Sequence, residues 1–416
     1  MKSQFVQSVK SRLRHLSRRD FFKGTGLFAL TSLSGCQKKP VTPAFSPRIS
    51  IPTYESVGVN AYINCGGYST MSGGSKIWPE VRMAMVEASK ICPNIDELQE
   101  AIGKRIGELM GAEWACVTSG CAAAITAATC ACIAGTNPEK MRMLPNFPGA
   151  KNEVMIASNH RNNYDSSISM TGAKIVEFTT KEEMDKKIND RTAMIYAFGS
   201  HFPDEEGITF KDWVSVGKKH GVPLFVDAAA ERPDVPNIYI NAGVDLVGYS
   251  GGKALRGPQG SGLLVGRKDL VKAAYLNTSP HHSFGRPMKY GKEDIMGLLA
   301  AVDLWVHADH ADIEKQWRSS YDYITNKLSS IPTVKTEISD SNYKGRLHQS
   351  NVAVNMTIDW DEAVVKISKA EMNRQMREGT PHISRGTRIS AYNWDPGDEV
   401  IVAQRIYDIL SSAVKS

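Results

Sequence analysis

The sequence lacks low-complexity and collagen-like bias, and over most of its length it also lacks net charge. The 416 residues include 50 Lys and Arg against 44 Asp and Glu, but seven of the basic residues and only one acidic residue precede Cys36. The remainder is formally neutral, so it offers no argument for the basic surface that nucleic-acid binding requires. We therefore expect no nucleic-acid partner. The length suits one large domain and a smaller one.

Cysteines are also few, and their spacing lacks the paired pattern of a zinc site. Apart from Cys36, they lie in apolar or Gly-rich stretches. We interpret them as small core residues, with a disulfide or metal site as the alternative, and we predict no metal. They are Cys65, Cys92, Cys116, Cys121, Cys130 and Cys132.

The N-terminus has the pattern of an export signal rather than of a folded element. Residues 17–23, Ser-Arg-Arg-Asp-Phe-Phe-Lys, resemble a twin-arginine signal, and the apolar run at 26–33 is too short to span a bilayer. Leu33-Ser34-Gly35-Cys36 resembles a lipobox. We predict a signal over residues 1–36 and export to the periplasm or cell envelope, with a lipid on Cys36 as the only membrane attachment. A basic amphipathic tail with a chance cysteine is the alternative.

Beyond the signal, the pattern predicts a tether and two domains. Residues 37–58 contain four prolines and suit a tether. Residues 59–290 open with a Gly-rich segment and then alternate short apolar strands with helices, which indicates an α/β domain with a mostly parallel sheet. Residues 291–416 suit a smaller α+β domain that begins with one long helix, Lys292 to Leu328.

Four polar features stand at predicted strand ends. Asp227 ends an apolar strand, and Ser250-Gly251-Gly252-Lys253 ends another. Ser119-Gly120-Cys121 joins a strand to a helix N-terminus, which is a natural anion cradle. His160 follows the strand at 153–157. Each feature alone is weak, because strand-end Asp residues and Ser-Gly turns are common; their joint occurrence is the signal.

Together these features match what pyridoxal 5′-phosphate (PLP) requires of a protein. A lysine amine must condense with its aldehyde, and an acid must keep its pyridine nitrogen protonated. Its phosphate requires N–H donors at a helix N-terminus, and its ring requires a flat group on one face. The candidate for the amine is Lys253, and the candidate for the acid is Asp227. The Ser119 segment would supply the N–H donors, and His160 the flat group.

The same residues resemble the fold-type I PLP enzymes, in particular the branch of bacterial selenocysteine synthase (L-seryl-tRNA selenium transferase) and D-glucosaminate-6-phosphate ammonia-lyase. The resemblance runs from about Asn64 to Gly297. It is carried by Ile63-Asn64 to Gly73-Gly74, Asp96-Glu97-Leu98-Gln99, Thr118-Ser119-Gly120, His160-Arg161-Asn162, Val226-Asp227-Ala228-Ala229, Ser250-Gly251-Gly252-Lys253-Ala254-Leu255-Arg256-Gly257-Pro258-Gln259-Gly260 and Gly285-Arg286-Pro287-Met288.

The resemblance implies specific roles. Lys253 would be the Schiff-base lysine, Asp227 the pyridinium partner and His160 the stacking residue. It also implies a homodimer or larger homo-oligomer, in which Arg256 or Arg286 serves a neighbour's site; Arg256 is further counted among the cofactor-binding residues. The phosphate ligands would be Ser119, Gly120, Cys121 and Ser250.

The substrate does not carry over from these relatives. The selenium transferases have an N-terminal tRNA-binding domain, and here an export signal and a tether stand in its place. Arg385 is our preferred ligand for a substrate carboxylate over Arg388, with surface charge as the alternative for either. Asn64, Tyr68, Thr70 and Arg286 are further substrate candidates, and a plain turn is the alternative for the first three.

We therefore predict a PLP-dependent lyase that acts on a small-molecule amino acid or amino-sugar acid by Cα deprotonation and elimination. A PLP-dependent aminotransferase or a β-replacement enzyme is the alternative, because the same residues support these reactions. A lipid-anchored binding protein without catalysis is the third hypothesis, and the presence of both Lys253 and Asp227 argues against it.

Overall fold

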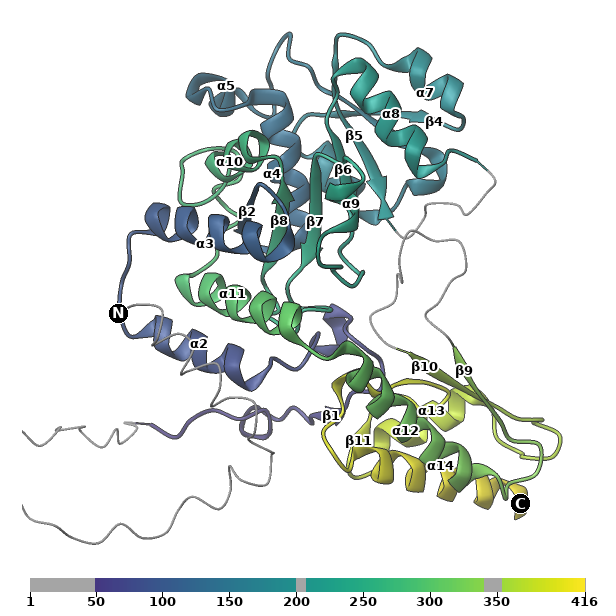
Figure 1. Cartoon of the computed structure of the whole chain (residues 1–416). Coiled ribbons are helices and arrows are strands. Elements are labelled where there is room, and N and C mark those ends of the chain that lie inside the picture. The colour runs from purple at the N-terminus through teal and green to yellow at the C-terminus, as the bar shows by residue number, and fades with distance from the viewer. Residues whose placement is uncertain (1–48, 200–206, 340–353, 416) are drawn as a thin grey trace, which may run out of the picture. The chain divides into compact units, whose positions relative to one another are not determined.

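A seven-stranded sheet organises the larger part of the molecule (Figure 1). β8 runs antiparallel to both of its neighbours, and the strands from β7 to β4 are parallel. The computed structural model describes residues 49–199, 207–339 and 354–415. The predicted mostly parallel α/β sheet is confirmed. Its strands, in spatial order, are β2 (Trp114–Thr118), β8 (Gly262–Gly266), β7 (Leu246–Ser250), β6 (Leu224–Asp227), β5 (Thr192–Phe198), β3 (Glu153–Ala157) and β4 (Lys174–Phe178).

Alternate side chains of each strand enter two separate cores. In β2, Ala115 and Val117 join one core, and Trp114 and Cys116 join the other. The first core is closed by α2 (Pro79–Ser89), α3 (Ile95–Met110), α7 (Lys181–Lys187), α8 (Phe210–His220), α9 (Ile238–Asn241) and α11 (Lys292–His307). The second is closed by α4 (Gly120–Ala134), α5 (Pro138–Met143), α6 (Ser166–Ser169) and α10 (Lys268–Leu276).

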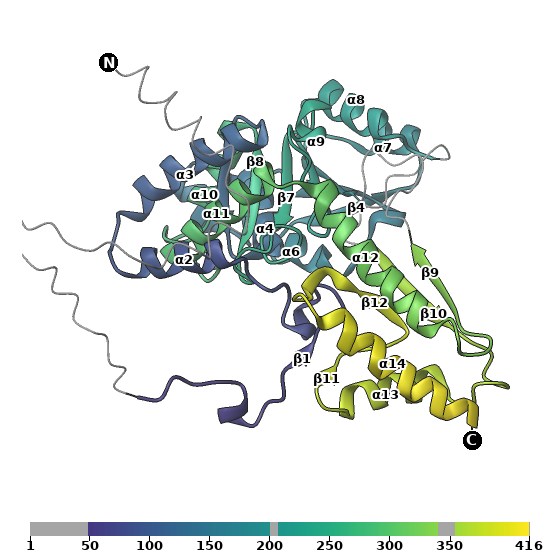
Figure 2. The same ribbon diagram turned by 60° about the horizontal axis from the view of Figure 1, so that its bottom comes forward.

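The C-terminal part has a core of its own, built on a three-stranded antiparallel sheet (Figure 2). The strands are β9 (Lys335–Ser339), β10 (Asn355–Asp359) and β12 (Arg388–Ser390). The helices are α12 (His310–Leu328), α13 (Lys369–Glu378) and α14 (Asp398–Lys415), and α12 packs along α14. The predicted domain boundary at residue 291 stays a prediction; α11, which follows it, packs against α2 and α3.

The single long helix expected from Lys292 to Leu328 is wrong, because two helices occupy this stretch. Ala308 is extended, with φ −70° and ψ 144°, and it ends α11. Asp309 then caps α12 by accepting a hydrogen bond from the Asp312 N–H at 3.0 Å. Asp stabilises a helix start by satisfying a free N–H group, and this local preference competes with continuing the preceding helix.

The segment before the sheet connects to the C-terminal part. β1 (Tyr62–Ile63) pairs in parallel with β11 (His382–Ile383). The Cys65 N–H donates to Ser384 Oγ at 2.8 Å, and the Cys65 carbonyl accepts from the Ser390 N–H at 2.9 Å. These contacts hold the start of the Gly-rich segment beside the loop that follows β11.

Residues 1–57 form a separate unit, of which residues 49–57 are described. They contain one short 3₁₀ turn, Glu55–Val57. The predicted twin-arginine signal and Cys36 lie outside the described residues. Within the described ranges, we find no helix that combines the length and apolarity needed to cross a membrane.

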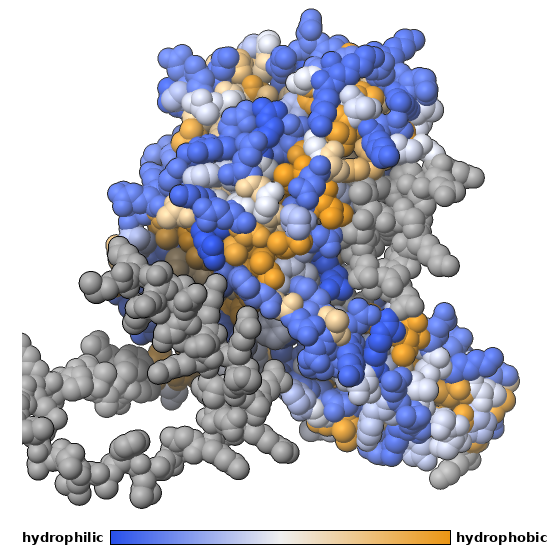
Figure 3. Space-filling model, viewed as in Figure 1, coloured by the Kyte–Doolittle hydropathy of each residue, from blue (hydrophilic) through white to orange (hydrophobic). Residues whose placement is uncertain are grey.

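The six described cysteines are all free. Cys92 is exposed, so its assignment to the core is wrong, and Cys132 is half-buried; the other four are buried as predicted. Cys92 follows α2 in the connection to α3, where the chain runs on the outside. Hydrophilic residues cover most of the visible face of the molecule, with smaller hydrophobic areas between them (Figure 3).

Candidate active site

Asp227 is the last residue of β6, and its place in the sheet determines its surroundings. It lies in register with Phe198 of β5 and Gly248 of β7, both on parallel strands. Ligands of open α/β sheets bind at this carboxyl edge. Glycine is required at 248, because a Cβ there would lie 2.8 Å from the Phe225 ring and 2.9 Å from Cys121 Sγ.

The Asp227 carboxylate is 1% exposed and accepts three hydrogen bonds. Oδ1 accepts from the Ala229 N–H at 3.0 Å and from the Cys121 thiol at 3.6 Å, and Oδ2 accepts from the Tyr196 hydroxyl at 2.8 Å. Burial raises the pKa of Asp227, whereas these donors and the charge of Lys253 lower it. These donors offset part of the free-energy cost of removing the carboxylate charge from water.

Both side-chain donors keep their protons. Burial, followed by the Asp227 charge, raises the pKa of the Tyr196 hydroxyl. The same two causes raise the pKa of the Cys121 thiol well above its usual value. The neutral groups therefore act as donors to the carboxylate, which is an arrangement suited to a carboxylate that must stay ionised to hold a cation.

Lys253 lies in the turn after β7, and its backbone is fixed from two sides. The Lys253 carbonyl accepts hydrogen bonds from the Tyr392 hydroxyl at 2.7 Å and from Ser75 Oγ at 3.1 Å. Its amine lies 5.9 Å from the centroid of the Tyr68 ring. Among the described residues, Nζ has no ion-pair or hydrogen-bond partner, so the amine is available to react.

The predicted anion cradle starts α4. Ser119 is the N-cap but makes no side-chain capping hydrogen bond, and Gly120 has φ +82° with open space where a Cβ would be. Gly262 of β8 allows this close approach, because a Cβ there would lie 2.2 Å from the Gly120 carbonyl carbon. The first N–H groups of α4 remain for an anion. The Cys121 side chain points to Asp227, so an anion here would contact its backbone.

His160 ends the 3₁₀ turn Ser158–His160 that follows β3, and it is 1% exposed. Its Nδ1 accepts from the Phe198 N–H at 3.0 Å, and its ring stacks on Trp213 with centroids 4.9 Å apart. The backbone donor assigns the His160 proton to Nε2. Its predicted stacking on a cofactor ring stays a prediction.

Asn64 and Arg385 meet beside Gly66 of the Gly-rich segment, whereas Tyr68 of the same segment contacts the Tyr392 ring, with centroids 5.8 Å apart. Asn64 Oδ1 accepts from the Gly66 N–H at 2.7 Å, and its Nδ2 donates to the Gly67 carbonyl at 2.8 Å, so Asn64 shapes this loop. The exposed Arg385 lies beside Gly66, 3.4 Å from the position of a Cβ. Among the described residues, Arg385 makes no ion pair, which suits a ligand for a substrate anion.

Three other predicted residues have different contacts. Thr70 is exposed at the start of the 3₁₀ turn Thr70–Ser72. Arg286 contacts Ser279 Oγ at 3.4 Å in the loop after α10. Arg256, with φ +52°, stacks its guanidinium 3.8 Å from the Trp78 ring and donates to the Lys76 carbonyl. That Arg256 or Arg286 contributes to the active site of a neighbouring subunit stays a prediction.

Sequence reasoning missed Tyr196 and Tyr392. Tyr196 lies two residues before the end of β5, so its hydroxyl is next to β6 and Asp227. A buried Tyr requires a partner for its hydroxyl, and that requirement was the usable signal. Tyr392 lies 139 residues after Lys253, and nothing local in the sequence indicates that they meet.

The fold and this arrangement at the carboxyl edge of the sheet define a fold-type I PLP enzyme. The chain belongs to the aminotransferase class-V family, whose profile matches residues 86–380. A PLP requirement is implied by this membership, and the residues of the site fit the cofactor: a buried carboxylate, an unpaired amine and an uncapped helix start.

Curated relatives include several different enzymes. The 5′-C-glycyluridine monooxygenase-decarboxylase of a Streptomyces species is 29% identical over 342 residues, which is 79% of this chain and 83% of that protein. The D-glucosaminate-6-phosphate ammonia lyase of Salmonella typhimurium is 33% identical over 260 residues, 60% and 69% of the two chains. The L-seryl-tRNA(Sec) selenium transferase of Aquifex aeolicus is 27% identical over 234 residues, 49% and 50% of the chains.

A solved structure of D-glucosaminate-6-phosphate ammonia-lyase superposes with a TM-score of 0.75 at 26% identity, covering 88% of this chain and all of that one. The predicted resemblance to the ammonia-lyase and to the selenium transferases is therefore confirmed. The reaction and the substrate are separate questions, because these relatives carry names of different reactions.

Proposed function

We propose that this protein is a PLP-dependent lyase that removes ammonia from an amino acid or amino-sugar acid with a leaving group on Cβ. The observation that carries the proposal is that the Lys253 amine, which makes no hydrogen bond or ion pair among the described residues, lies near the hydrogen-bonded Asp227 carboxylate. The chain is also similar to an ammonia lyase in sequence and fold. When bound, PLP supplies an aldehyde for an amine and an electron sink for charge on Cα.

Lys253, Asp227 and the start of α4 have distinct roles in this proposal. The Lys253 amine would hold the cofactor covalently, and the same amine would serve as the general base for the Cα proton of the substrate. Asp227 keeps a proton at the ring nitrogen, because a buried carboxylate favours a cation beside it. The N–H groups of Gly120 and Cys121, with Ser119 and Ser250, bind the phosphate.

Arg385 binds the substrate carboxylate in this proposal, and Tyr68 and Asn64 shape the space beside it. Loss of the Cα proton and of a hydroxyl with its electron pair from Cβ releases water. Once Lys253 replaces the substrate nitrogen on the cofactor, one water would hydrolyse the released enamine to a keto acid and ammonia. The net reaction would then give these two products with no net change in water. His160 stacks on the cofactor ring in this arrangement.

The cofactor assignment is tested by absorption and covalent trapping. Purified protein reconstituted with PLP is expected to absorb visible light, and borohydride is expected to fix the cofactor on Lys253. Lys253→Ala abolishes the fixed label, whereas Lys272→Ala, which removes an exposed lysine paired with Glu100, keeps it. A wild-type protein that binds no PLP, or a label that persists in Lys253→Ala, would contradict the proposal.

A second candidate reaction follows from the Streptomyces relative, whose sequence alignment covers more of this chain than the alignments of the Salmonella and Aquifex proteins. Decarboxylation with oxygen as co-substrate consumes O₂ and releases CO₂, whereas the lyase reaction releases ammonia and a keto acid. Transamination or β-replacement instead leaves the amino group on the cofactor or on the product. Measuring ammonia, CO₂ and O₂ during a screen of amino acids and amino-sugar acids separates these reactions.

A further inference from the structure

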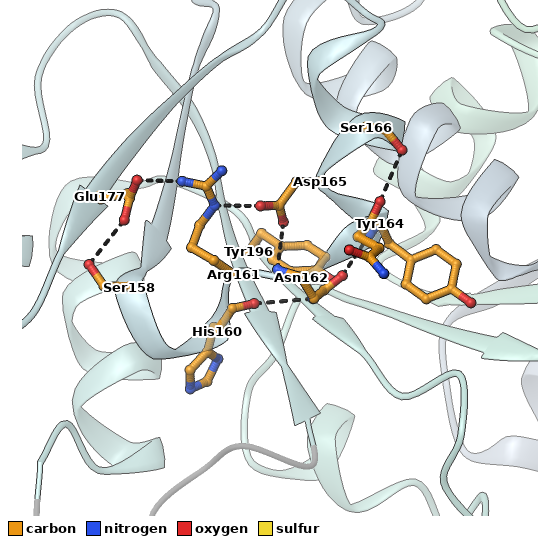
Figure 4. Close-up of polar contacts among 10 residues, drawn as sticks. Ser158, His160, Arg161, Asn162, Tyr164, Asp165, Ser166, Glu177 and Tyr196 are labelled. Atoms are coloured by element: carbon orange, nitrogen blue, oxygen red, sulfur yellow. Dashed lines mark hydrogen bonds and ion pairs between the residues drawn. The ribbon is translucent and has the colours of Figure 1, made fainter.

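Asp227 is connected to the outside of the sheet by a chain of polar contacts, which we call the Asp227 relay. Figure 4 shows the part of this chain that lies beyond Asp227, from Tyr196 to Arg161 and Glu177. The relay consists of Tyr196, Asn162, Asp165 and Arg161. The Tyr196 hydroxyl donates to Asp227 Oδ2 at 2.8 Å, and Asn162 Nδ2 donates to the Tyr196 oxygen at 3.4 Å. The relay therefore joins the end of β6 to the segment that follows His160.

The direction of the Tyr196 proton follows from these contacts. The Asn162 amide nitrogen has two hydrogens, which point to the Tyr196 oxygen and to the His160 carbonyl, the latter at 3.1 Å. Since the Tyr196 oxygen accepts from Asn162, its own proton is free to point to Asp227. An amide nitrogen has no acceptor, so Asn162 cannot compete with Asp227 for that proton.

Asn162 is itself held in place at the N-terminus of the 3₁₀ turn Asn163–Asp165. Its Oδ1 accepts from the Tyr164 N–H at 2.8 Å, which leaves Nδ2 facing Tyr196. Asp165 accepts from the Asn162 N–H and forms an ion pair with Arg161. Arg161 also pairs with Glu177 of β4, so the turn is fixed to the edge of the sheet (Figure 4).

We propose that Tyr196 is a positioning residue that keeps Asp227 ionised and directed at the cofactor's ring nitrogen, and that Asn162 sets the direction of its hydroxyl. This inference rests on the proposed function, in which Asp227 holds that nitrogen. The titratable groups that face Asp227 are Tyr196 from β5, Cys121 from α4 and Lys253 from the turn after β7. Of the two side-chain donors, the Tyr196 hydroxyl makes the shorter contact, and an oxygen donor is stronger than a thiol.

The test compares PLP binding to the cofactor-free protein as a function of pH. In Tyr196→Phe, loss of a hydrogen bond to a buried charge is expected to raise the Kd for PLP about tenfold at neutral pH. Without this donor the pKa of Asp227 rises, so Asp227 becomes protonated at higher pH. The acid limb of the affinity profile is therefore expected to move to higher pH by about one unit.

Tyr275→Phe is the matched control, because it removes a tyrosine hydroxyl that donates to a different carboxylate, Asp96, at 2.6 Å. We expect a wild-type Kd and acid limb in this variant. A wild-type Kd and acid limb in Tyr196→Phe would overturn the inference while leaving the proposed function intact. Failure of the wild-type chain to bind PLP would overturn both.

Asn162→Asp provides a second variant that tests the relay without altering the tyrosine. It keeps the capping oxygen but replaces the Nδ2 donor with a second acceptor for the Tyr196 proton. We expect the acid limb to move in the same direction as in Tyr196→Phe, with a Kd rise of about threefold. Should Tyr196→Phe fail to fold by circular dichroism, a wild-type acid limb in Asn162→Asp would overturn the inference.

Discussion

At the scale of single residues, Asp227 combines a functional position with a cost in stability. Its folded-state pKa is raised by burial above that of the unfolded chain. The stability contributed by such a group is fully present below the unfolded pKa and is lost as pH rises through the folded pKa. Above its folded pKa, the ionised carboxylate thus makes the cofactor-free protein less stable than a neutral side chain would.

We expect Asp227→Asn to stabilise the cofactor-free protein by about 1 kcal/mol at pH 8 while it weakens PLP binding. The gain should shrink as pH falls through the folded pKa of Asp227, because the wild-type group then becomes neutral too. Urea denaturation over a pH series measures this difference. Asp96→Asn, at an exposed carboxylate, should show no gain, and a gain for Asp227→Asn that is constant across pH would contradict the explanation.

Lys253 and Asp227 were visible in the sequence because each stands at the end of an apolar run. The ring contacts of Arg256 had no such local signal in the sequence. Its guanidinium stacks on Trp78 and lies 5.6 Å from the Tyr392 ring, and burial lowers its pKa. These partners are distant in sequence on both sides, so its cation–π contacts depend on the tertiary fold.

At the scale of elements, α3 approaches β2 closely because of Gly103. A Cβ at this position would lie 2.4 Å from the Ala115 carbonyl oxygen and 2.5 Å from Trp114 Nε1. Ala is a better helix former than Gly by about 1 kcal/mol, but the clash outweighs this preference. The glycine therefore determines how near the helix lies to the edge of the sheet.

We expect Gly103→Ala to destabilise the protein by roughly 2 kcal/mol, measured by chemical denaturation. Gly260→Ala is the control, because no atom lies within 4 Å of its Cβ position. This control should change stability by less than about 0.5 kcal/mol. Unchanged stability in Gly103→Ala would mean that α3 moves away from β2 at little cost.

Predictions of elements succeeded where one local pattern dominated. The strand predicted at 153–157 has a clear apolar pattern, and β3 has these same ends. The break between α11 and α12 was missed because apolar spacing continues across it. There Asp309 caps a new helix. The break depends on tertiary packing, because α11 packs into the first core of the large sheet and α12 into the core of the C-terminal part.

At the scale of the whole molecule, we propose export by the twin-arginine route and a lipid on Cys36. The supporting pattern lies outside the described residues, so it rests on the sequence alone. A twin-arginine substrate folds before export, which fits an enzyme that must acquire its cofactor first. Residues 37–58 would then act as a tether between the anchor and the folded part.

We expect Cys36→Ala to abolish labelling by a radioactive fatty acid and to release the protein from the membrane fraction. Replacing Arg18 and Arg19 by Lys should leave the precursor in the cytoplasm. Cell fractionation with mass measurement of the mature chain tests both outcomes. Cys92→Ala removes the exposed cysteine of the folded part and should retain the label; label in Cys36→Ala would contradict the proposal.

The sequence by itself determined the class of fold and indicated the PLP chemistry. Apolar runs that end in Asp227 and in Ser250-Gly-Gly-Lys253 indicate a strand end and a reactive turn, because these patterns are local. Only the tertiary structure decided what surrounds them. Tyr196, Cys121 and Tyr392 come from elements far apart in the chain, and side-chain contacts of that kind are fixed by the order and register of the strands rather than by local preference.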